Sequence, residues 1–515
     1  MRQLTELPHC AFIWKEGKHM NDSLRIDLSA YQSETLELEG KSVSFRAFRN
    51  LQYCRNPLDP IQKMNLFIPE AYFHDQGIGR YTKDNAPYFL PNTVGGYLPG
   101  PADEPGVDSH SGRPNTLFEA LTHGLIAASA GVRGRTSGKA SNEFFEGSKE
   151  HFTAEETGRM VGRAPAFIVD YKAAVRFLRH NADILPGRTD RIITNGTSAG
   201  GALSALAGAT GNSSDYEPYL KQIGAAEERD DIFAASCYCP IHNLENADKA
   251  YEWQFYGENS FHRTKHQKSE NGIIRVPYEG VMTKEQQAAS KPLKDAFPAY
   301  LNSLHLTAGG KELTLDAEGK GSFKEWVMGK ILASAQKESL THDNESNRPE
   351  RMTKGSFIDE QNYISYKDGK PVSFDWRDYI QKITRMKAAP AFDSLDMNSP
   401  ENEEFGDEQV DARHFTAYSF EHSLNEHPLK ADERIVRLMN PTIFIQEDRT
   451  DIAPHWRIRH GAFDRDTSLA VPAILALLLE DHGKDVDFFY PWGIPHAGDY
   501  DMDDLFAWIE SITVE

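Results

Sequence analysis

Hydrophobic and polar residues alternate along the first third of the chain in short segments typical of strands. Residues 42–48 alternate polar with apolar side chains, and residues 63–69 form a similar segment. Residues 86–91 and 125–129 are short apolar runs that suit buried strands, and the Gly-rich residues 92–100 follow the first run. This part of the chain is therefore predicted to supply several strands of a sheet.

A helical pattern begins after these strands. Four apolar residues recur at helical spacing: Ile168, Tyr171, Val175 and Leu178. A short apolar run at 190–195 then precedes small, helix-compatible residues at 199–207. The alternation of strands and helices predicts an α/β fold, with a mostly parallel sheet and helices on both of its faces.

The pattern changes in the middle of the chain. From about residue 242 to about residue 434 the chain is polar, with helical stretches such as 323–331. We therefore predict a catalytic domain formed by residues 1–241 and 435–515 and interrupted by an inserted lid, residues 242–434. Such a lid would shape a pocket and exclude water from it.

Strand-like patterns return after the inserted segment. They lie at residues 439–445 and 485–491. Residues 501–509 follow as a helix with acidic residues in its first turn, which suits the helix dipole. Its inward side would carry Leu505, Phe506, Trp508 and Ile509.

Residues 196–200 read G-x-S-x-G, between the strand at 190–195 and the helix at 199–207. A strand, a sharp turn and a helix form the setting of a nucleophile elbow. The two glycines let strand and helix pass closely, and the helix N-terminus favours negative charge beside Ser198. This context favours a catalytic serine over an ordinary Gly-rich turn. In such hydrolases a Gly-rich loop after an earlier strand completes the oxyanion hole, so we expect the backbone N–H groups of Gly95 and Ala199 to supply it.

An activated serine needs a base and a carboxylate that orients the base. In this fold the chain order is serine, acid, histidine, and His496 lies in the loop expected after the last strand. The acid should follow the preceding strand, which we expect to end near Gln446. Spacing leaves four candidates open, each of which also suits a turn or a helix cap: Asp448, Asp451, Asp464 and Asp466.

Composition narrows the partners. The 515 residues carry a formal net charge of −21, from 56 basic and 77 acidic residues. Phosphate backbones select clustered Lys and Arg, so this balance argues against nucleic acid and anionic membranes. Apolar runs are shorter than a membrane span, and residues 1–8 lack the features of a signal peptide. We therefore expect a cytoplasmic protein.

The four cysteines do not form a disulfide framework in a chain of this length. Cys237 and Cys239 have the wrong spacing for the usual zinc knuckle and lack a second pair, so we interpret them as buried, small apolar residues. No metal site and no cofactor are predicted.

Several motifs along the chain resemble the bacterial tannases, which are tannin acyl hydrolases with an α/β-hydrolase domain and a large inserted lid. The matching stretches occur in the family's order and span almost the whole chain: residues 91–97, 195–204, 385–393, 401–402, 405–406, 459–468 and 495–500. This similarity is far more specific than the elbow alone.

The resemblance implies a role for particular residues. It selects Asp464 as the acid, with Ser198 as nucleophile and His496 as base. It also implies that Lys387, Glu401 and Asp466 contact the three phenolic hydroxyls of a galloyl ring, since carboxylates accept hydrogen bonds from phenols and an ammonium donates to a phenolic oxygen. Without the resemblance, Lys387 and Glu401 would read as solvated surface charges, and Asp466 as a turn residue.

The sequence departs from the wider group at two positions. Fungal tannases and related feruloyl esterases carry a disulfide between cysteines directly before the catalytic serine and histidine, where this chain has Thr197 and Pro495. The resemblance thus places the chain in the bacterial branch, which works in reducing compartments. The expected function is hydrolysis of galloyl esters, small phenolic molecules, through a galloyl-enzyme intermediate. Two alternatives are a feruloyl or general carboxylesterase of the same fold, and a catalytically silent phenolic-binding module. The intact Ser, Asp and His set argues against the second.

Overall fold

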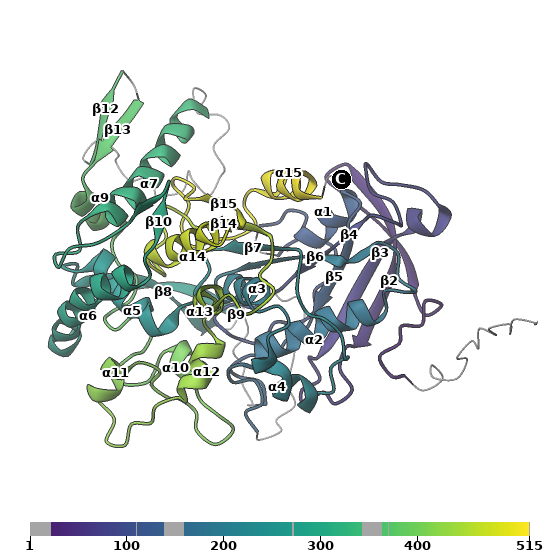
Figure 1. Ribbon diagram of the computed structural model, residues 1–515, viewed down its shortest axis with the longest axis horizontal. Helices are drawn as coiled ribbons and strands as arrows, with labels where there is room; N and C mark the ends of the chain where they lie inside the picture. Colours follow the sequence, from purple (N-terminus) through teal and green to yellow (C-terminus); the bar gives the residue numbers. More distant parts are fainter. Residues whose placement is uncertain are drawn as a thin grey trace, which may run out of the picture.

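A nine-stranded sheet forms the centre of the computed structural model, which describes residues 22–109, 111–138, 159–269, 272–341, 363–368 and 370–513 (Figure 1). Cys10 and residues 1–8, on which the expected location rests, lie outside these ranges. The sheet has the order β1-β2-β3-β5-β4-β6-β7-β14-β15. Its strands are β1 Gln32–Leu38, β2 Lys41–Gln52, β3 Lys63–Pro69, β4 Pro87–Pro91, β5 Ile126–Ala130, β6 Arg188–Thr197, β7 Ala234–Tyr238, β14 His455–Arg459 and β15 Asp485–Phe489.

Most of this sheet is parallel, as predicted. Strands β5, β4, β6, β7, β14 and β15 pair in parallel, whereas β1, β2 and β3 add an antiparallel edge that joins β5. Buried parallel strands need helices on both faces. These are α1 Thr116–Thr122, α2 Ala166–His180, α3 Ala199–Ala209, α4 Glu217–Gln222, α14 Ala470–Asp481 and α15 Met502–Ile512, with 3-10 turns η1 Glu70–His74 and η2 Ser214–Tyr216. Figure 1 shows α1 and α15 on one side of the sheet and α2 and α4 on the other.

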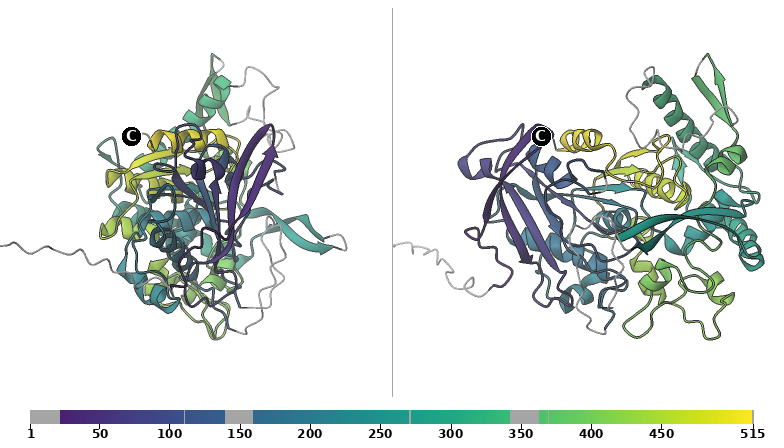
Figure 2. Two further views of the ribbon diagram at one scale, coloured as in Figure 1. Left: turned by 90° about the vertical axis from the view of Figure 1, so that its right-hand side faces the viewer. Right: turned by 180° about the vertical axis from the view of Figure 1, so that it is seen from behind.

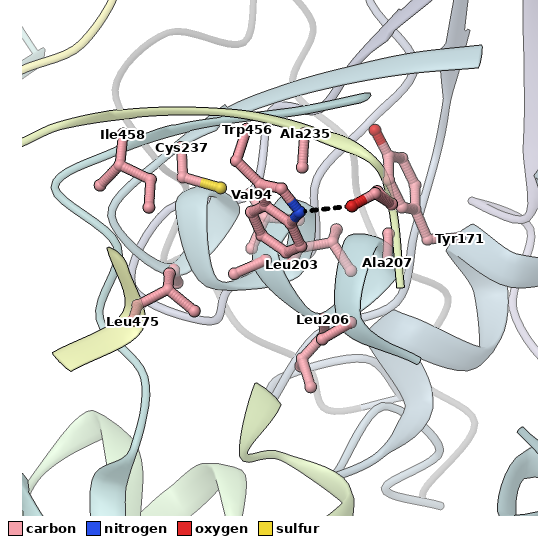
Figure 3. Close-up of a cluster of buried hydrophobic side chains, with 14 of the residues drawn as sticks. Val94, Tyr171, Leu203, Leu206, Ala207, Ala235, Cys237, Trp456, Ile458 and Leu475 are labelled. Atoms are coloured by element: carbon pink, nitrogen blue, oxygen red, sulfur yellow. Dashed lines mark hydrogen bonds between the residues drawn. The ribbon is translucent and has the colours of Figure 1, made fainter. Parts of the chain in front are cut away.

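The core holds helix α3 close to the sheet (Figure 3). Trp456 of β14 is fully buried, and its indole N–H donates to the Ala453 carbonyl at 2.8 Å. A Cβ atom on Gly208 of α3 would lie 2.6 Å from the Trp456 ring, so this contact requires glycine. The close packing fixes the position of the α3 N-terminus, where Ser198 lies.

Four neighbouring parallel strands end at the same level. Their last paired residues form one row, the strand-end row: Thr197, Tyr238, Arg459 and Phe489. The hydrogen-bond ladder continues one residue further. The backbone N–H groups of Ser198, Cys239 and His460 donate to the row carbonyl of the adjacent strand at 3.0, 2.6 and 3.2 Å. The residues that follow these strands are therefore brought to one edge of the sheet.

The chain between β7 and β14 is an insertion, because these two strands are hydrogen-bonded neighbours. Its helices are α5 Leu244–Phe255, α6 Lys284–Ser303, α7 Ser322–Thr341, α9 Trp376–Ile383, α10 Pro400–Glu404, α11 Ala417–Glu421, α12 Glu433–Leu438 and α13 Pro441–Glu447. Among the described residues of the insertion, three two-stranded sheets accompany them: β8 Ser260–Ser269 with β9 Gly272–Val281, β10 Thr307–Ala308 with β11 Lys311–Glu312, and β12 Ile364–Lys367 with β13 Lys370–Phe374. Figure 2 shows much of this material gathered at the end of the molecule away from β1–β3. The boundaries at 242 and 434 stay a prediction.

One predicted strand is wrong. Residues 439–445 were expected to form a strand ending near Gln446, but α13 occupies Pro441–Glu447. Asn440 caps this helix by accepting the Thr442 N–H at 3.0 Å, and proline suits the first helical position. The strand that precedes the acid is β14. Its arginines make it look exposed in the sequence, although Arg457 is fully buried and donates to Asp501 at 2.5 Å.

The other expected elements are confirmed. Residues 42–48 lie in β2, the periodic residues 168–178 lie in α2, and the 323–331 stretch lies in α7. The closing helix α15 buries the four predicted residues Leu505, Phe506, Trp508 and Ile509. Among the residues described above, no helix is both long and apolar enough to cross a membrane.

Candidate active site

Ser198 occupies the turn between β6 and α3 with φ 63° and ψ −122°. This backbone region is costly for a residue with a side chain and persists only where the surroundings impose it. The surroundings here are tight: a Cβ on Gly196 would lie 2.2 Å from the Gly200 carbonyl oxygen, and one on Gly200 would lie 2.4 Å from Asn92 Oδ1. The G-x-S-x-G spacing is thus explained by close approach of strand and helix, as the sequence predicts.

Asn92 joins the Gly-rich loop after β4 to this elbow. Its Nδ2 donates to the carbonyls of Asn195 and Gly200 at 3.1 and 3.0 Å, and its Oδ1 accepts the Val94 N–H at 3.3 Å. Gly95 follows Val94 directly, and Ala199 is the first residue of α3. The two segments expected to supply oxyanion donors are therefore tied to each other, and the role of their N–H groups stays a prediction.

Asp464 and His496 are in direct contact. His496 Nδ1 lies 2.7 Å from Asp464 Oδ2, and Asp464 is fully buried. The other carboxylate oxygen accepts the Asp466 N–H at 2.8 Å, which holds the acid in place. A carboxylate on Nδ1 leaves Nε2 available for another group, which is the arrangement a general base requires.

The remaining candidate acids are not the partner of His496 Nδ1. Asp448 is exposed at the C-terminus of α13. Asp451 is also exposed and accepts a hydrogen bond from Asn212 at 2.6 Å. Asp466 faces the other side of the histidine, with Oδ2 4.0 Å from His496 Nε2. The geometry therefore places Asp464, rather than the other three, on Nδ1.

The charges of this pair reinforce each other. Burial opposes ionisation of His496, but the Asp464, Cys239 and Asp466 side chains outweigh it and hold the pKa of His496 well above its usual value. Burial would raise the pKa of Asp464, yet His496 and His460 lower it to about 2. Asp464 thus stays ionised and stabilises a protonated His496.

Lys387, Asp466 and Glu401 form a second charged set beside this pair. Lys387 Nζ lies 2.5 Å from Asp466 Oδ1 and 4.0 Å from the centroid of the Phe392 ring. Glu401, in α10, is 5% exposed. These side chains are not the solvated surface charges that they resemble in the sequence. Two hydrogen-bond acceptors, Glu401 and Asp466, thus come close to one donor, Lys387. Lys387 and Glu401 belong to the insertion, and Asp466 follows β14 at the edge of the sheet.

Their pKa values reflect this mutual contact. Burial opposes the charge on Lys387, but Asp466 and Glu401 outweigh it and raise its pKa. Burial would raise the pKa of Asp466, and Lys387 keeps it lowered. Burial raises the pKa of Glu401, and Lys387 only partly opposes this shift. Glu401 is therefore the member of the set whose charged form is disfavoured by burial on balance.

Sequence reasoning missed the residues that hold Lys387. Tyr251 of α5 accepts the backbone N–H groups of Met386 and Lys387 at 3.0 and 3.1 Å. The fully buried Arg385 donates to the Lys387 carbonyl at 2.7 Å and pairs with the fully buried Glu252. Tyr251 and Glu252 lie far from Lys387 in the sequence and belong to no motif. Only Arg385 had a signal in the sequence, because it lies within residues 385–393, which resemble the bacterial tannases.

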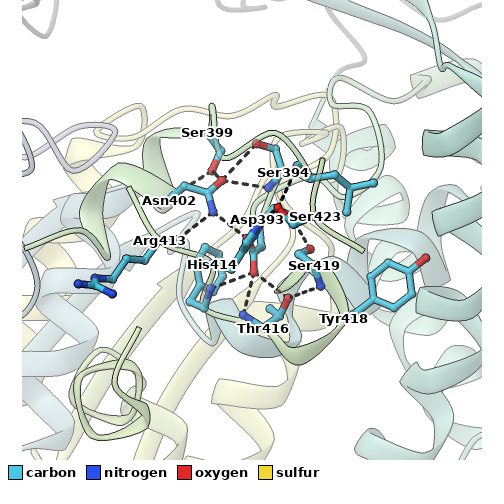
Figure 4. A network of polar contacts seen from close by, with 12 residues as sticks. Asp393, Ser394, Ser399, Asn402, Arg413, His414, Thr416, Tyr418, Ser419 and Ser423 are labelled. Carbon is cyan, nitrogen blue, oxygen red and sulfur yellow. Dashed lines mark hydrogen bonds and ion pairs between the residues drawn. The ribbon is translucent and has the colours of Figure 1, made fainter. Parts of the chain in front are cut away.

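Asp393 organises the segment that carries Glu401 (Figure 4). It is fully buried and accepts hydrogen bonds from His414 Nδ1 at 2.6 Å and Asn402 Nδ2 at 2.7 Å. It also accepts the Thr416 N–H at 2.7 Å. Asn402 directly follows Glu401 in the chain. This network therefore fixes the backbone position from which the Glu401 side chain extends.

Cys239 lies next to the histidine. It is a free, fully buried cysteine, as predicted, but its Sγ lies 3.9 Å from His496 Nε2. Sγ also donates to the Ala497 carbonyl at 3.4 Å. The sequence predicted a buried, small apolar residue here, and its proximity to His496 follows from the alignment of the strand ends.

Solved structures of tannases match most of this chain, including the following three. Tannase from Lactobacillus plantarum in an orthorhombic crystal is 44% identical with a TM-score of 0.85, and the match covers 95% of this chain and 100% of that one. Tannase from Fusobacterium nucleatum is 44% identical with a TM-score of 0.85, covering 95% and 99%. A tannin acyl hydrolase in complex with ethyl gallate is 44% identical with a TM-score of 0.84, covering 95% and 99%.

Two shorter matches, to a family profile and to a curated esterase, are consistent with a hydrolase. A family profile described as BD-FAE matches residues 150–290. Esterase LipQ from Mycobacterium tuberculosis (strain ATCC 25618 / H37Rv) is 34% identical over 88 residues, which are 17% of this chain and 20% of that protein. The chain thus matches only about a fifth of the length of this curated relative, so the full-length structural matches carry the conclusion. The chain belongs to the bacterial tannase family, the tannin acyl hydrolases with an α/β-hydrolase fold and an inserted lid, and it is a carboxylic ester hydrolase.

Proposed function

We propose that this protein hydrolyses galloyl esters through Ser198, His496 and Asp464. One observation carries the proposal: Asp466 Oδ2 lies 4.0 Å from His496 Nε2, while its Oδ1 pairs with Lys387. Asp466, Lys387 and Glu401, whose polar groups suit phenolic hydroxyls, thus lie next to the proposed base His496. The relative in complex with ethyl gallate supports the same substrate class.

The proposed reaction has two halves. His496 Nε2 takes the proton of Ser198 Oγ as this oxygen attacks the ester carbonyl carbon, and Asp464 stabilises the imidazolium. The backbone N–H groups of Gly95 and Ala199 hold the oxyanion, a contribution of roughly 3 kcal/mol for each such donor in comparable hydrolases. His496 then gives its proton to the departing alcohol. Water attacks the galloyl-enzyme by the reverse steps and releases gallic acid.

The ring site, formed by Lys387, Glu401 and Asp466, determines which acyl groups are preferred. Glu401 and Asp466 accept hydrogen bonds from phenolic hydroxyls, and Lys387 donates to a phenolic oxygen. A site built to bind hydroxyls disfavours rings without them, because its buried polar groups are then left unpaired. We therefore expect gallate esters to be preferred over benzoate esters. A feruloyl or general carboxylesterase would lack this preference.

Kinetics on matched esters test the proposal. kcat/KM is measured for methyl gallate, methyl ferulate, methyl benzoate and a simple activated ester. Lys387→Ala and Glu401→Ala should each lower kcat/KM for methyl gallate by about ten- to a hundredfold, as expected for roughly 1.5–3 kcal/mol per charged hydrogen bond. Both should lower the activated-ester rate much less. Lys284→Ala, an exposed residue of α6, is the matched control.

Two results would overturn the assignment. Equal losses on gallate and on the activated ester, with no wild-type preference for trihydroxylated rings, would leave a general esterase. Failure of a serine-reactive phosphonate to label Ser198, together with no hydrolysis, would leave a silent phenolic-binding module.

Two further expectations belong to the same proposal. The net charge of −21 supports a protein that does not bind nucleic acid. A cytoplasmic location is proposed from the sequence, and cell fractionation would test it.

A further inference from the structure

The side chain of Asn92 lies against both glycines of the elbow. A Cβ atom on Gly196 would lie 2.4 Å from Asn92 Nδ2, and one on Gly200 would lie 2.4 Å from Asn92 Oδ1. These separations are too short for a side chain at either glycine position. The glycines of the G-x-S-x-G stretch therefore make room for the Asn92 carboxamide, in addition to letting strand and helix approach each other.

Asn92 connects the start of the Gly-rich loop to both sides of the elbow turn. Its Nδ2 donates to the Asn195 carbonyl of β6 at 3.1 Å and to the Gly200 carbonyl of α3 at 3.0 Å. Its Oδ1 accepts the Val94 N–H at 3.3 Å, and its own backbone N–H donates to the Asn195 carbonyl at 2.9 Å. One side chain therefore sets the position of the loop relative to the strand and to the helix.

Tyr97 fixes the other end of the same loop. Its hydroxyl donates to the Ile241 carbonyl at 2.7 Å, and the Ile241 N–H donates to the Ser198 carbonyl at 3.2 Å. Tyr97 is buried, and its backbone φ is 59°. A residue with a side chain keeps this conformation only where its surroundings impose it. Residues 92–97 are thus anchored at both ends to the turn that carries Ser198.

We propose that Asn92 and Tyr97 are positioning residues of the oxyanion hole. By holding both ends of the loop, they direct the Gly95 N–H toward the same point as the Ala199 N–H. Donors that are already in place stabilise an oxyanion strongly, because they need no reorientation as the charge develops. Both side chains act through the loop and not on the substrate. This inference rests on the proposed function, since the two N–H groups serve a reaction at Ser198.

Two residues elsewhere in the fold make the same kinds of hydrogen bond and provide matched controls. Asn181, at the end of α2, is fully buried. Its carboxamide donates to two backbone carbonyls at 3.0 and 2.9 Å and accepts one backbone N–H at 2.9 Å. The hydroxyl of the fully buried Tyr216 donates to the Leu438 carbonyl at 2.6 Å. Asn181→Ala and Tyr216→Phe therefore remove equivalent contacts without touching the loop.

Kinetics on methyl gallate and on the simple activated ester give the first test. Asn92→Ala should lower kcat by about a hundredfold, similar to the loss of one oxyanion donor. Asn92→Asp should do the same, because it keeps the shape but turns an oxygen toward two carbonyls. Tyr97→Phe should cost about fivefold, the equivalent of one neutral hydrogen bond. The losses should be equal on the two esters, since the oxyanion hole acts on the ester carbonyl and not on the ring. The two control variants should keep wild-type kcat.

Ligand binding separates a positioning role from general damage to the site. Pyrogallol carries three phenolic hydroxyls and no carbonyl, so calorimetry should give the wild-type Kd for it in Asn92→Ala and Tyr97→Phe. Benzeneboronic acid probes the oxyanion hole instead. Ser198 Oγ adds to its boron atom, the hydroxyl proton goes to His496, and the tetrahedral adduct resembles the reaction intermediate. Its Kd should rise about as much as kcat falls.

Two results would overturn the positioning role. One is wild-type kcat in Asn92→Ala and Asn92→Asp. The other is an equal weakening of pyrogallol and boronic acid binding, which would show that these residues support the whole site. Tyr97→Phe removes one atom and keeps the ring, so it decides the question even where Asn92→Ala does not fold. Absence of methyl gallate hydrolysis by wild type would instead contradict the proposed acyl preference, and the activated ester and the boronic acid would still decide the role of the loop.

Discussion

The hydroxyl of Tyr251 donates a hydrogen bond to the backbone carbonyl of Arg465 at 2.8 Å. Arg465 lies between Asp464 and Asp466, and the same hydroxyl accepts the N–H groups of Met386 and Lys387. One atom of the insertion therefore sets the distance between the acid loop and the lysine. Tyr251 is a positioning residue that connects the proposed triad to the proposed ring site.

Tyr251→Phe should separate these two loops without emptying the core. We expect kcat/KM for methyl gallate to fall at least about fivefold, the equivalent of one hydrogen bond of about 1 kcal/mol, because three backbone groups lose their partner and the two loops can shift. The gallate-to-benzoate ratio should fall with it, because Lys387 is displaced from Asp466. Tyr256→Phe, at a tyrosine 47% exposed, is the control. An unchanged ratio in Tyr251→Phe would contradict the positioning role.

Asp464→Asn should reduce kcat by orders of magnitude, about 10⁴-fold in a comparable triad. The pH profile gives an independent readout. Burial lowers the pKa of His496 and Asp464 raises it, so the wild-type acid limb of kcat/KM should lie above the ordinary histidine value of about 6.5. Loss of the carboxylate should move this limb to lower pH. Asp451→Asn, an exposed position, should change neither quantity. A larger loss at Asp451 than at Asp464 would reverse the choice of acid.

Gly498→Ala should displace the histidine loop. A Cβ at this position would lie 1.8 Å from Thr197 Oγ1 and 2.8 Å from Thr197 Cβ, so the loop that carries His496 must move. Misplacement by about 1 Å can cost about a hundredfold in rate. Gly329→Ala in α7 is the control, because no atom lies within 4 Å of its Cβ and alanine favours helices by up to about 1 kcal/mol. Wild-type kcat/KM in Gly498→Ala would show that the loop tolerates the contact.

His460→Phe should reduce the acid sensitivity of folding. Burial lowers the pKa of His460 to about 4, so the folded state binds fewer protons than the unfolded state between about pH 6.5 and about pH 4. Stability from this group is complete above pH 6.5 and is lost as the pH falls, by about 3 kcal/mol over the window. Urea unfolding at pH 7 and pH 4.5 should therefore show a smaller difference for His460→Phe than for wild type. The exposed His305→Phe is the control, and equal differences for all three proteins would contradict the shift.

The fold could be predicted where apolar patterns are local. Buried parallel strands such as β4 and β5 read as continuous apolar runs, and α15 shows its buried side directly. β14 could not be found in this way. Its Arg457 is fully buried through an ion pair with Asp501, 44 residues away, and no local pattern reveals such a partner. The apolar run before it formed helix α13 because Asn440 and Pro441 provide a cap and a first turn.

The candidate site was predictable to the extent that chain order determines it. Ser198 and His496 follow from the elbow and the last strand, whereas the choice between Asp464 and Asp466 depends on which side of the histidine each faces. Lys387 and Glu401 needed a family resemblance, since the contacts that make them buried are made by distant residues. Tyr251 and Cys239 belong to no motif, and their positions became visible only with the packing.

The strand-end row also determines where the chain can change in length. Thr197, Tyr238, Arg459 and Phe489 are aligned across four strands, so adding or deleting one residue within any of these strands would shift its loop by about 3.3 Å and turn its side chains to the opposite face. The segment between β7 and β14 has no such constraint, because it leaves and re-enters the sheet at adjacent strands. Natural divergence and protein engineering can therefore lengthen, shorten or exchange parts of this segment while the four strand ends stay aligned.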